Sequence, residues 1–142
     1  MLYDALEDPA SGTPADLRAA YESELRSVVE TLGVDRVATE TGIEAGRLER
    51  LVDGETAPEL TLSEAAGVVA LAPSSPDADA VEATVRDHIL MGMTTGVLDV
   101  DAVASNVDLD LSGQEIQQAI EGRVPMTLEQ LAAIQQFVES RQ

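Results

Sequence analysis

Three glutamines lie close together in the last third of the chain, at Gln114, Gln117 and Gln118. On a helix that turns by about 100° per residue, they share one outward face with Glu121. A glutamine amide can form two hydrogen bonds with an adenine base in the major groove of DNA, and the nearby Arg123 is placed to reach a phosphate. The same pattern is also typical of a solvated helix face. Reading of DNA bases and simple solvation therefore stay open as two interpretations of this face.

Arg47 and Arg50 are the other candidate nucleic-acid contacts. They lie three residues apart on the flank of a second predicted helix, where ion pairs with Glu44, Glu49 or Asp53 are an alternative use. One acidic and two small residues come directly before Arg47, so the start of this helix offers few donors to DNA bases.

Other groupings of reactive residues predict little chemistry. His88 and two nearby methionines could bind a soft metal, but a single His with no Cys is more typical of a helix edge. Asp99 and Asp101 lack the glycine and the distal Glu of a calcium loop. All eight basic residues are Arg, so the chain has no Schiff-base or phosphate-loop lysine, and it has no cysteine nucleophile. We therefore predict a protein that is not an enzyme and that has no metal and no cofactor.

Helix-start signals recur along the chain and predict an all-α fold of about eight helices. Thr13 precedes Pro14, and capping boxes, in which Ser or Thr is followed three residues later by Glu or Gln, begin at Thr61, Ser112 and Thr127. Ser75 with Pro76 predicts a further start in the same style. The predicted helices cover about 14–32, 35–41, 44–53, 62–72, 76 to a bend or frayed end at 92–96, 99–106, 112–121 and 128 onward.

Similar residues recur about 66 positions apart in the two halves of the chain. The offset is 66 residues from Val34 to Val100, 68 from Gly54 to Gly122, and 66 again from Thr61 to Thr127. Changes in length that fall in turns, such as two extra residues near Leu111, are typical of a duplicated helical unit. We predict an N-terminal extension at 1–12, a first four-helix lobe at 13–72, a linker at 73–76 and a second lobe at 77–142.

Each lobe resembles the phage-repressor-like helix-turn-helix family. In 34–71 the small, glycine, proline and aliphatic positions of that family are held by Ala38, Gly42, Ile43, Leu48, Leu51, Gly54, Pro58, Leu60, Ala66 and Leu71. In 100–137 they are held by Ala104, Ile116, Ile120, Gly122, Pro125 and Leu128. The resemblance implies a helix-turn-helix fold, with recognition helices at about 44–53 and 112–121 that bind DNA. The matching positions are core and turn residues, so the resemblance indicates the fold more specifically than it indicates DNA binding.

The charge of the chain is strongly acidic. Against 8 Arg there are 27 Asp and Glu, which gives a net charge of −19. This composition resembles that of proteins from halophilic archaea that accumulate salt. At molar salt the Debye length falls to about 3 Å and screens the self-repulsion of such a surface, so we expect folding to require salt. An acidic interaction protein from a low-salt organism is the alternative.

These features together predict binding rather than catalysis. We expect a cytoplasmic protein with no membrane contact, because the N-terminus lacks the basic and apolar regions of a signal peptide and no segment has about 20 apolar residues. The favoured prediction is a DNA-binding, transcription-related regulator of a halophile, and such modules commonly form homodimers that read paired half-sites. The alternative is a protein-interaction module whose helix-turn-helix-derived fold no longer binds nucleic acid.

Overall fold

The computed structural model describes residues 2–54 and 59–142, and this part of the chain is all-α with eight α-helices, as predicted. Two short 3-10 turns come before the helices. The elements are η1 (Leu2–Asp4), η2 (Pro9–Ser11), α1 (Pro14–Leu32), α2 (Val34–Thr41), α3 (Ala45–Asp53), α4 (Leu62–Val69), α5 (Ala78–Thr95), α6 (Val100–Asn106), α7 (Gly113–Ile120) and α8 (Leu128–Ser140). Pro58, one of the family-like positions, lies outside the described residues. Among the described helices, none is long and apolar enough to cross a membrane.

The predicted capping boxes are confirmed at four helix starts. The hydroxyl groups of Thr13, Thr61, Ser112 and Thr127 each accept a hydrogen bond of 3.1–3.2 Å from the backbone N–H three residues later. The side chain at that later position accepts in return from the backbone N–H of the cap. A cap of this kind typically stabilises a helix by about 1 kcal/mol, so these four sites set where α1, α4, α7 and α8 begin.

The predicted start of the fifth helix was wrong. Asp77, not Ser75, caps α5, because its carboxylate accepts from the N–H of Ala80 at 2.8 Å while the Ser75 hydroxyl donates to the Pro76 carbonyl at 3.0 Å. The helix continues through Gly92 and ends at Thr95, within the range 92–96 predicted for its bend or frayed end.

Gly92 serves helix packing rather than helix ending. A Cβ atom at Gly92 would lie 2.6 Å from Cγ1 of Val138, closer than real Cβ contacts come. The glycine therefore lets α5 approach α8 closely while the α5 backbone stays helical.

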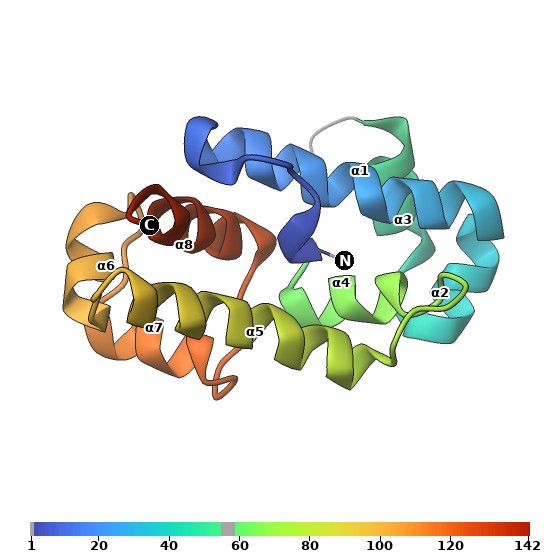
Figure 1. Ribbon diagram of the computed structural model, residues 1–142. Helices are drawn as coiled ribbons and strands as arrows, with labels where there is room; N and C mark the ends of the chain where they lie inside the picture. Colours follow the sequence, from blue (N-terminus) through green and yellow to red (C-terminus); the bar gives the residue numbers. More distant parts are fainter. Residues whose placement is uncertain (1, 55–58) are drawn as a thin grey trace.

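The long helices α1 and α5 lie on opposite sides of the molecule, with α8 and α4 between them (Figure 1). α1 packs against both α8 and α4, and α5 likewise packs against both α4 and α8. The pair α2 and α3 lies at one end of the molecule, and the pair α6 and α7 lies at the other (Figure 1). The first long helix of each predicted lobe therefore lies against the last helix of the other lobe as well as its own.

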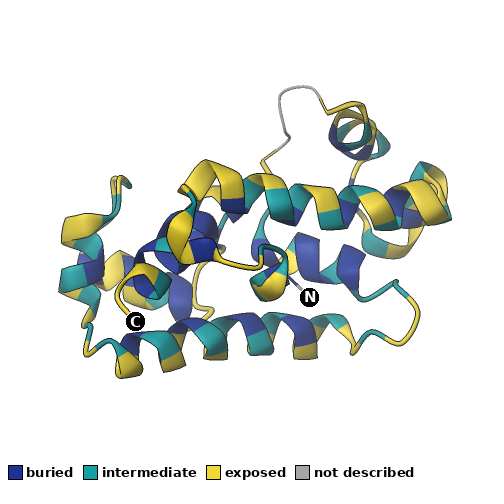
Figure 2. Cartoon of the chain, turned by 45° about the horizontal axis from the view of Figure 1, so that its top comes forward, coloured by how far each residue is buried: buried dark blue, intermediate teal, exposed yellow. Residues whose placement is uncertain are grey.

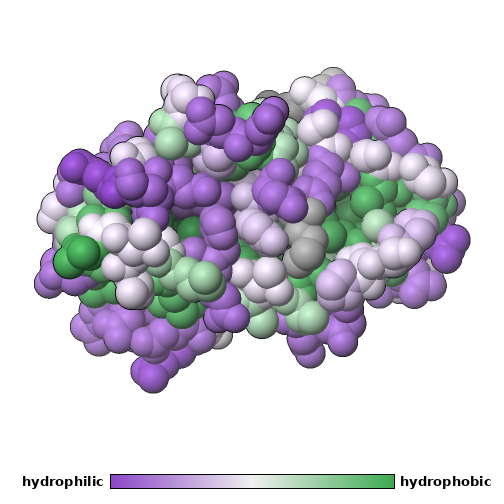
Figure 3. Space-filling model, in the orientation of Figure 1, coloured by the Kyte–Doolittle hydropathy of each residue, from purple (hydrophilic) through white to green (hydrophobic). Residues whose placement is uncertain are grey.

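One apolar core runs through both halves of the chain. It contains inward positions of α1 (Leu17, Tyr21, Leu25, Val29), of α5 (Val81, Val85, Ile89, Met93) and of α8 (Leu128, Leu131, Ile134, Val138). Figure 2 shows buried residues on the inward sides of the long helices and exposed residues on their outward sides. The face seen in Figure 3 is mostly hydrophilic, with apolar patches between the polar side chains.

The two halves meet through a reciprocal pair of backbone hydrogen bonds. The N–H of Leu62 donates to the Met126 carbonyl at 2.7 Å, and the N–H of Leu128 donates to the Leu60 carbonyl at 2.9 Å. These bonds form an antiparallel bridge between residues 61 and 127, which are the positions matched 66 residues apart in the sequence. Leu60 and Met126 are both buried beneath the bridge. Matched segments of the two halves therefore contact each other across a local two-fold relation.

Because the long helices reach across this junction, we predict that neither half folds alone. Separate chains of residues 1–73 and 74–142 should show no cooperative thermal unfolding by circular dichroism, since each exposes a core face that the other half covers. A full chain cleaved within 73–76 is the control, and it should stay folded because both faces remain covered. Cooperative unfolding of either isolated half would contradict the prediction.

Val97 adopts a backbone conformation that favours glycine. Its φ is +54°, its side chain is 90% exposed, and it follows the end of α5, where the N–H of Leu98 closes on the Met93 carbonyl at 2.8 Å. A β-branched residue is strained in this region, and its exposed side chain buries little apolar area in return.

Val97→Gly should therefore raise the free energy of unfolding by about 1 kcal/mol, or roughly 2–4 °C in Tm, which a thermal melt measures. Val97→Ala is the matched control and should gain less than Val97→Gly, because alanine keeps most of the strain. Equal stability of the two variants would show that the strain carries no cost.

Candidate functional site

On the predicted DNA-reading face of α7, the hydrogen-bond donors Gln117 and Arg123 lie beside the carboxylate of Glu121. Gln114 and Gln117 are exposed, as predicted, whereas Gln118 is half-buried. The Gln117 amide donates to Glu121 Oε1 at 2.9 Å, and Arg123 Nε lies 3.1 Å from Glu121 Oε2. Two of the four predicted α7 contacts are thus brought together around one carboxylate. The Glu121 carboxylate accepts a hydrogen bond from Gln117 and pairs with Arg123 Nε, and its negative charge would repel a phosphate backbone.

Gln118 faces a different surface from Gln117. It lines a small cavity of about 200 Å³ with Leu111, Val124 and Gln130, between α7 and the start of α8. The predicted set of three glutamines is therefore split between two surfaces.

Arg47 has a structural partner within the first half. Its guanidinium donates to both carboxylate oxygens of Glu64, from Nη1 at 2.7 Å and from Nη2 at 2.9 Å, and Nη2 also donates to the Glu59 carbonyl at 2.8 Å. Glu64 is the acidic member of the capping box of α4, so the pair ties α3 to the start of α4. Arg50 is exposed and forms no ion pair with other described residues. The two arginines therefore do not form one cationic patch.

Two half-buried arginines, Arg26 and Arg86, lie where sequence reasoning placed no functional residue. Arg26 Nε donates to the Leu51 carbonyl at 2.9 Å, at the end of α3. Arg86 forms an ion pair with Glu82 at 2.8 Å, and its Nε lies 3.2 Å from the Cβ position of Gly122, just after α7. A cation at the carboxyl end of a helix is favourable for the helix dipole. The signal in the sequence was a Glu four residues before each Arg, repeated 60 residues apart at Glu22 and Glu82.

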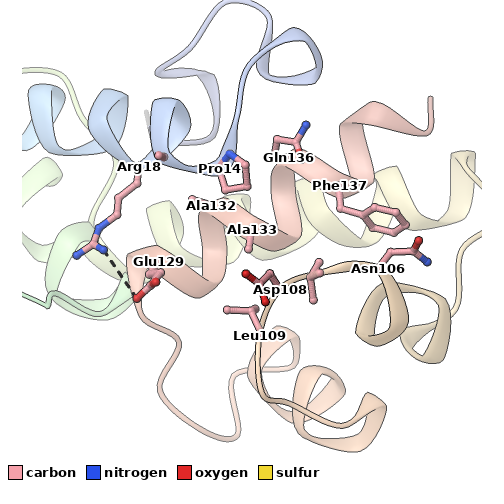
Figure 4. Close-up of a pocket in the computed structure, with 12 residues that line it drawn as sticks. Pro14, Arg18, Asn106, Asp108, Leu109, Glu129, Ala132, Ala133, Gln136 and Phe137 are labelled. Carbon is pink, nitrogen blue, oxygen red and sulfur yellow. Dashed lines mark ion pairs between the residues drawn. The ribbon is translucent and has the colours of Figure 1, made fainter.

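The clearest concave site lies along α8. A cavity of about 420 Å³ is bounded by α8, by the start of α1 and by the connection between α6 and α7 (Figure 4). Its lining residues are Pro14, Ala15 and Arg18 from α1, Asn106, Val107, Asp108 and Leu109 from the end of α6 and the following connection, and Glu129, Ala132, Ala133, Gln136 and Phe137 from α8. We call this cavity the α8 pocket. Its volume lies within the usual range for ligand sites, about 300–1,000 Å³.

The α8 pocket is bordered by a connection that differs in length between the two halves. Six residues, 107–112, join α6 to α7, whereas only three, 42–44, join α2 to α3. In the first half the shorter turn, with Gly42 in the left-handed region at φ +78°, lets Ile43 bury itself. It also brings the Thr41 methyl to within 3.8 Å of the Cβ position of Gly67 on α4.

The rim of the α8 pocket is polar and mostly acidic. Arg18 Nη1 lies 3.8 Å from Glu129, and Arg18 Nε lies 3.8 Å from Glu22, both beyond hydrogen-bond distance (Figure 4). The Nε atom is buried and has no hydrogen-bond partner among the described residues. Burial raises the pKa of Glu22, and the nearby Arg18 and Arg26 partly oppose this shift. The rim thus combines exposed carboxylates with one cation that is incompletely satisfied.

A buried polar network holds the N-terminal segment in place. The Tyr21 hydroxyl donates to the fully buried amide of Gln135, which donates to the Tyr3 carbonyl at 2.8 Å and to Glu139 at 2.9 Å. The ring of Tyr3 lies 4.7 Å from that of His88, whose Nε2 is 3.3 Å from Glu139. Burial first, and then the charge of Glu139, raise the pKa of Tyr21 well above its ordinary value. The network therefore holds η1 against α8 and α5, and His88 is part of it.

The described residues contain no group of three or more His, Cys, Asp or Glu side chains placed to hold a metal ion.

The Arg47–Glu64 pair predicts a pH-dependent stability. The hydrogen bonds from Arg47 are the main cause that holds the pKa of Glu64 below its ordinary value of 4.5, while burial opposes the shift and the Thr61 backbone N–H supports it. A lowered folded pKa stabilises the protein above pH 4.5, and this contribution is lost as the pH falls through the folded pKa.

Arg47→Met should lower the free energy of unfolding at pH 7 by about 1 kcal/mol, as measured by chemical denaturation in high salt. The difference from the wild type should shrink below about pH 4.5, where Glu64 of the variant becomes protonated. Glu64→Gln is the control, and it should remove the pH dependence of the Arg47→Met effect. A difference between Arg47→Met and the wild type that is constant down to pH 3 would contradict the assignment.

The comparisons with known proteins concern the family of the chain. A family of unknown function, DUF5791, matches residues 17–141. The matching family is not the phage-repressor-like family, so that resemblance stays a prediction. No curated protein and no solved structure matches the chain. Because the match spans all eight helices of the described fold apart from the first turn of α1, the chain belongs to the DUF5791 family.

Proposed function

We propose that this protein is a non-catalytic protein-interaction module that binds a partner protein at the α8 pocket. The observation that carries the proposal is a mostly apolar cavity that lies between α8, the start of α1 and the longer α6–α7 connection. Ala132 and Ala133 are buried below it, and Phe137 is 7% exposed at one end. A concave, mostly apolar site with a polar rim is typical of a pocket that receives an anchoring side chain.

DNA binding is the second candidate function. The observation that favours it is the α2–α3 turn, where left-handed Gly42 and buried Ile43 join two short helices as in a helix-turn-helix. Exposed Gln114 and Gln117 would then read bases from α7. The contacts within the protein argue against this function. Arg47 binds Glu64, and Gln117 and Arg123 both contact Glu121. The protein-interaction function therefore agrees better with how the donors are used.

A halophilic setting fits a contact that depends on apolar burial. With a net charge of −19, the chain strongly repels itself at low salt, and this repulsion is screened at molar salt. The same screening weakens the contacts between basic residues and DNA phosphates, whereas apolar burial stays effective at high salt. We propose that the protein works in a cytoplasm rich in salt.

A tandem duplication would explain how the two halves contact each other. The bonds between 60–62 and 126–128 join matched positions, and Arg26 and Arg86 lie at matched helix ends. An ancestral homodimer whose subunits became one chain would give both features. In this proposal the α8 pocket arose when one copy gained residues between its two short helices.

Blocking the α8 pocket tests the proposed function. Ala133→Phe should fill the cavity, which has room for a ring, and Ala19→Phe on the exposed face of α1 is the matched control. In 2 M KCl, we expect the wild type and Ala19→Phe to capture the same partner from cell extract and Ala133→Phe to lose it. The identified partner, once purified, should then shift the NMR signals of α8 amides in the wild type and in Ala19→Phe, but not in Ala133→Phe.

Genomic DNA fragments provide the second arm of the same experiment. Sequence-selective enrichment that disappears when Gln114, Gln117 and Gln118 are changed to Ala would support the DNA-binding function instead. Leu109→Ser is a second pocket variant, and circular dichroism checks that each variant is folded. A partner retained equally by both pocket variants would overturn the docking site.

A further inference from the structure

Resting on the proposed docking function, we infer that the α8 pocket receives an amphipathic, basic helical segment of the partner protein. The segment would insert two apolar side chains one helical turn apart and place Arg or Lys beside them. Three features of the pocket indicate such a segment. They are the apolar walls, the acidic rim and the unsatisfied hydrogen-bond donor of Arg18.

The apolar walls of the pocket indicate which side chains of the partner segment are buried in it. Ala132, Ala133 and Phe137 lie within about one and a half turns of α8, and Val107 and Leu109 line the cavity from the α6–α7 connection. The small side chains of Ala132 and Ala133 leave space in the middle of the pocket, and larger side chains border it on both sides (Figure 4). A cavity of about 420 Å³ between such walls suits a pair of side chains at positions i and i+4 of a helix better than one.

The charged groups at the rim of the pocket indicate which charge the partner segment carries. The charged groups that border the cavity are Arg18 from α1, Asp108 from the α6–α7 connection and Glu129 from α8. Glu129 is 63% exposed, and Arg18 lies 3.8 Å from both Glu129 and Glu22, so the cavity border carries one cation and two carboxylates, with Glu22 behind Arg18. Asp108 is also exposed. This balance, on a chain with a net charge of −19, favours a basic segment over an acidic one.

Arg18 sets which end of the segment lies nearby. Its Nε is buried and has no acceptor among the described residues, but the side chain as a whole is 26% exposed, so a bound segment can bring an acceptor to the exposed part of the guanidinium. A carboxylate acceptor would be repelled by Glu22 and Glu129, whereas a main-chain carbonyl would not. The last turn of a helix has free carbonyls, and basic residues are favourable there. The carboxyl end of the partner helix is therefore the part that fits beside Arg18.

Designed peptides test this inference with the full-length protein. The probe is a 14-residue helical peptide with leucine at its sixth and tenth positions and three arginines in its last six. One matched peptide replaces the arginines by glutamates, and another replaces the leucines by alanines. Binding is followed by ¹H–¹⁵N NMR titration of the wild type, Ala133→Phe and the control Ala19→Phe, in 0.5 M and 2 M KCl.

In 0.5 M KCl we expect the arginine peptide to shift the α8 amides and to bind about tenfold more tightly than the glutamate peptide, a ratio that two or three exposed charge pairs can supply. In 2 M KCl the ratio should fall below about threefold, because screening removes the charge contribution but leaves the apolar one. Asp108→Asn with Glu129→Gln should remove the preference, and Arg18→Met should weaken binding of the arginine peptide. The alanine peptide and the Ala133→Phe protein should show no binding.

The outcomes separate this inference from the proposed function. Equal binding of the arginine and glutamate peptides, with loss in Ala133→Phe, would keep the pocket as a docking site and overturn its basic preference. Tighter binding of the glutamate peptide would overturn the charge assignment in the same way. Unchanged binding by Ala133→Phe, or no binding of any peptide to the wild type, would overturn the inference that a helical segment enters this pocket.

Discussion

The fold depends on the contact of the two halves around the bridge between residues 61 and 127. The reciprocal hydrogen bonds of Leu62 and Leu128 place the starts of α4 and α8 side by side. From there α1 reaches α8, and α5 reaches α4, so that each long helix covers apolar surface in both halves. A four-helix unit of about 65 residues buries little apolar area by itself, and sharing the long helices gives both units one core. The stability of each half is therefore inseparable from that of the other.

This sharing also explains how one half could change without loss of the fold. The core is set by the long helices and by α4 and α8, whereas the short pairs α2–α3 and α6–α7 lie at the ends of the molecule. A longer connection at 107–112 alters only the outer end of its half. The α8 pocket thus borders a connection at a place where the core does not depend on close packing.

The arginines show how an acidic protein uses few cations. Arg47 fixes α4 to α3, and Arg26 and Arg86 lie at the ends of α3 and α7. Arg123 is exposed but lies beside Glu121. Most cations near the two recognition-like helices therefore stabilise the fold, and a surface poor in cations contacts a nucleic acid weakly unless base contacts dominate.

The sequence by itself determined the helices and their starts, because a hydroxyl followed by an acid or amide three residues later acts within one turn, and apolar spacing sets the buried side of each helix. It also showed the two extra residues near Leu111. Only the tertiary structure decided that residues 106–109 border a pocket on α8, that Arg47 is bound to Glu64, and that Gln118 lines a separate cavity. Such outcomes depend on distances between segments far apart in the chain. Local patterns carry no information on those distances, which are set by how the long helices of both halves pack into one core.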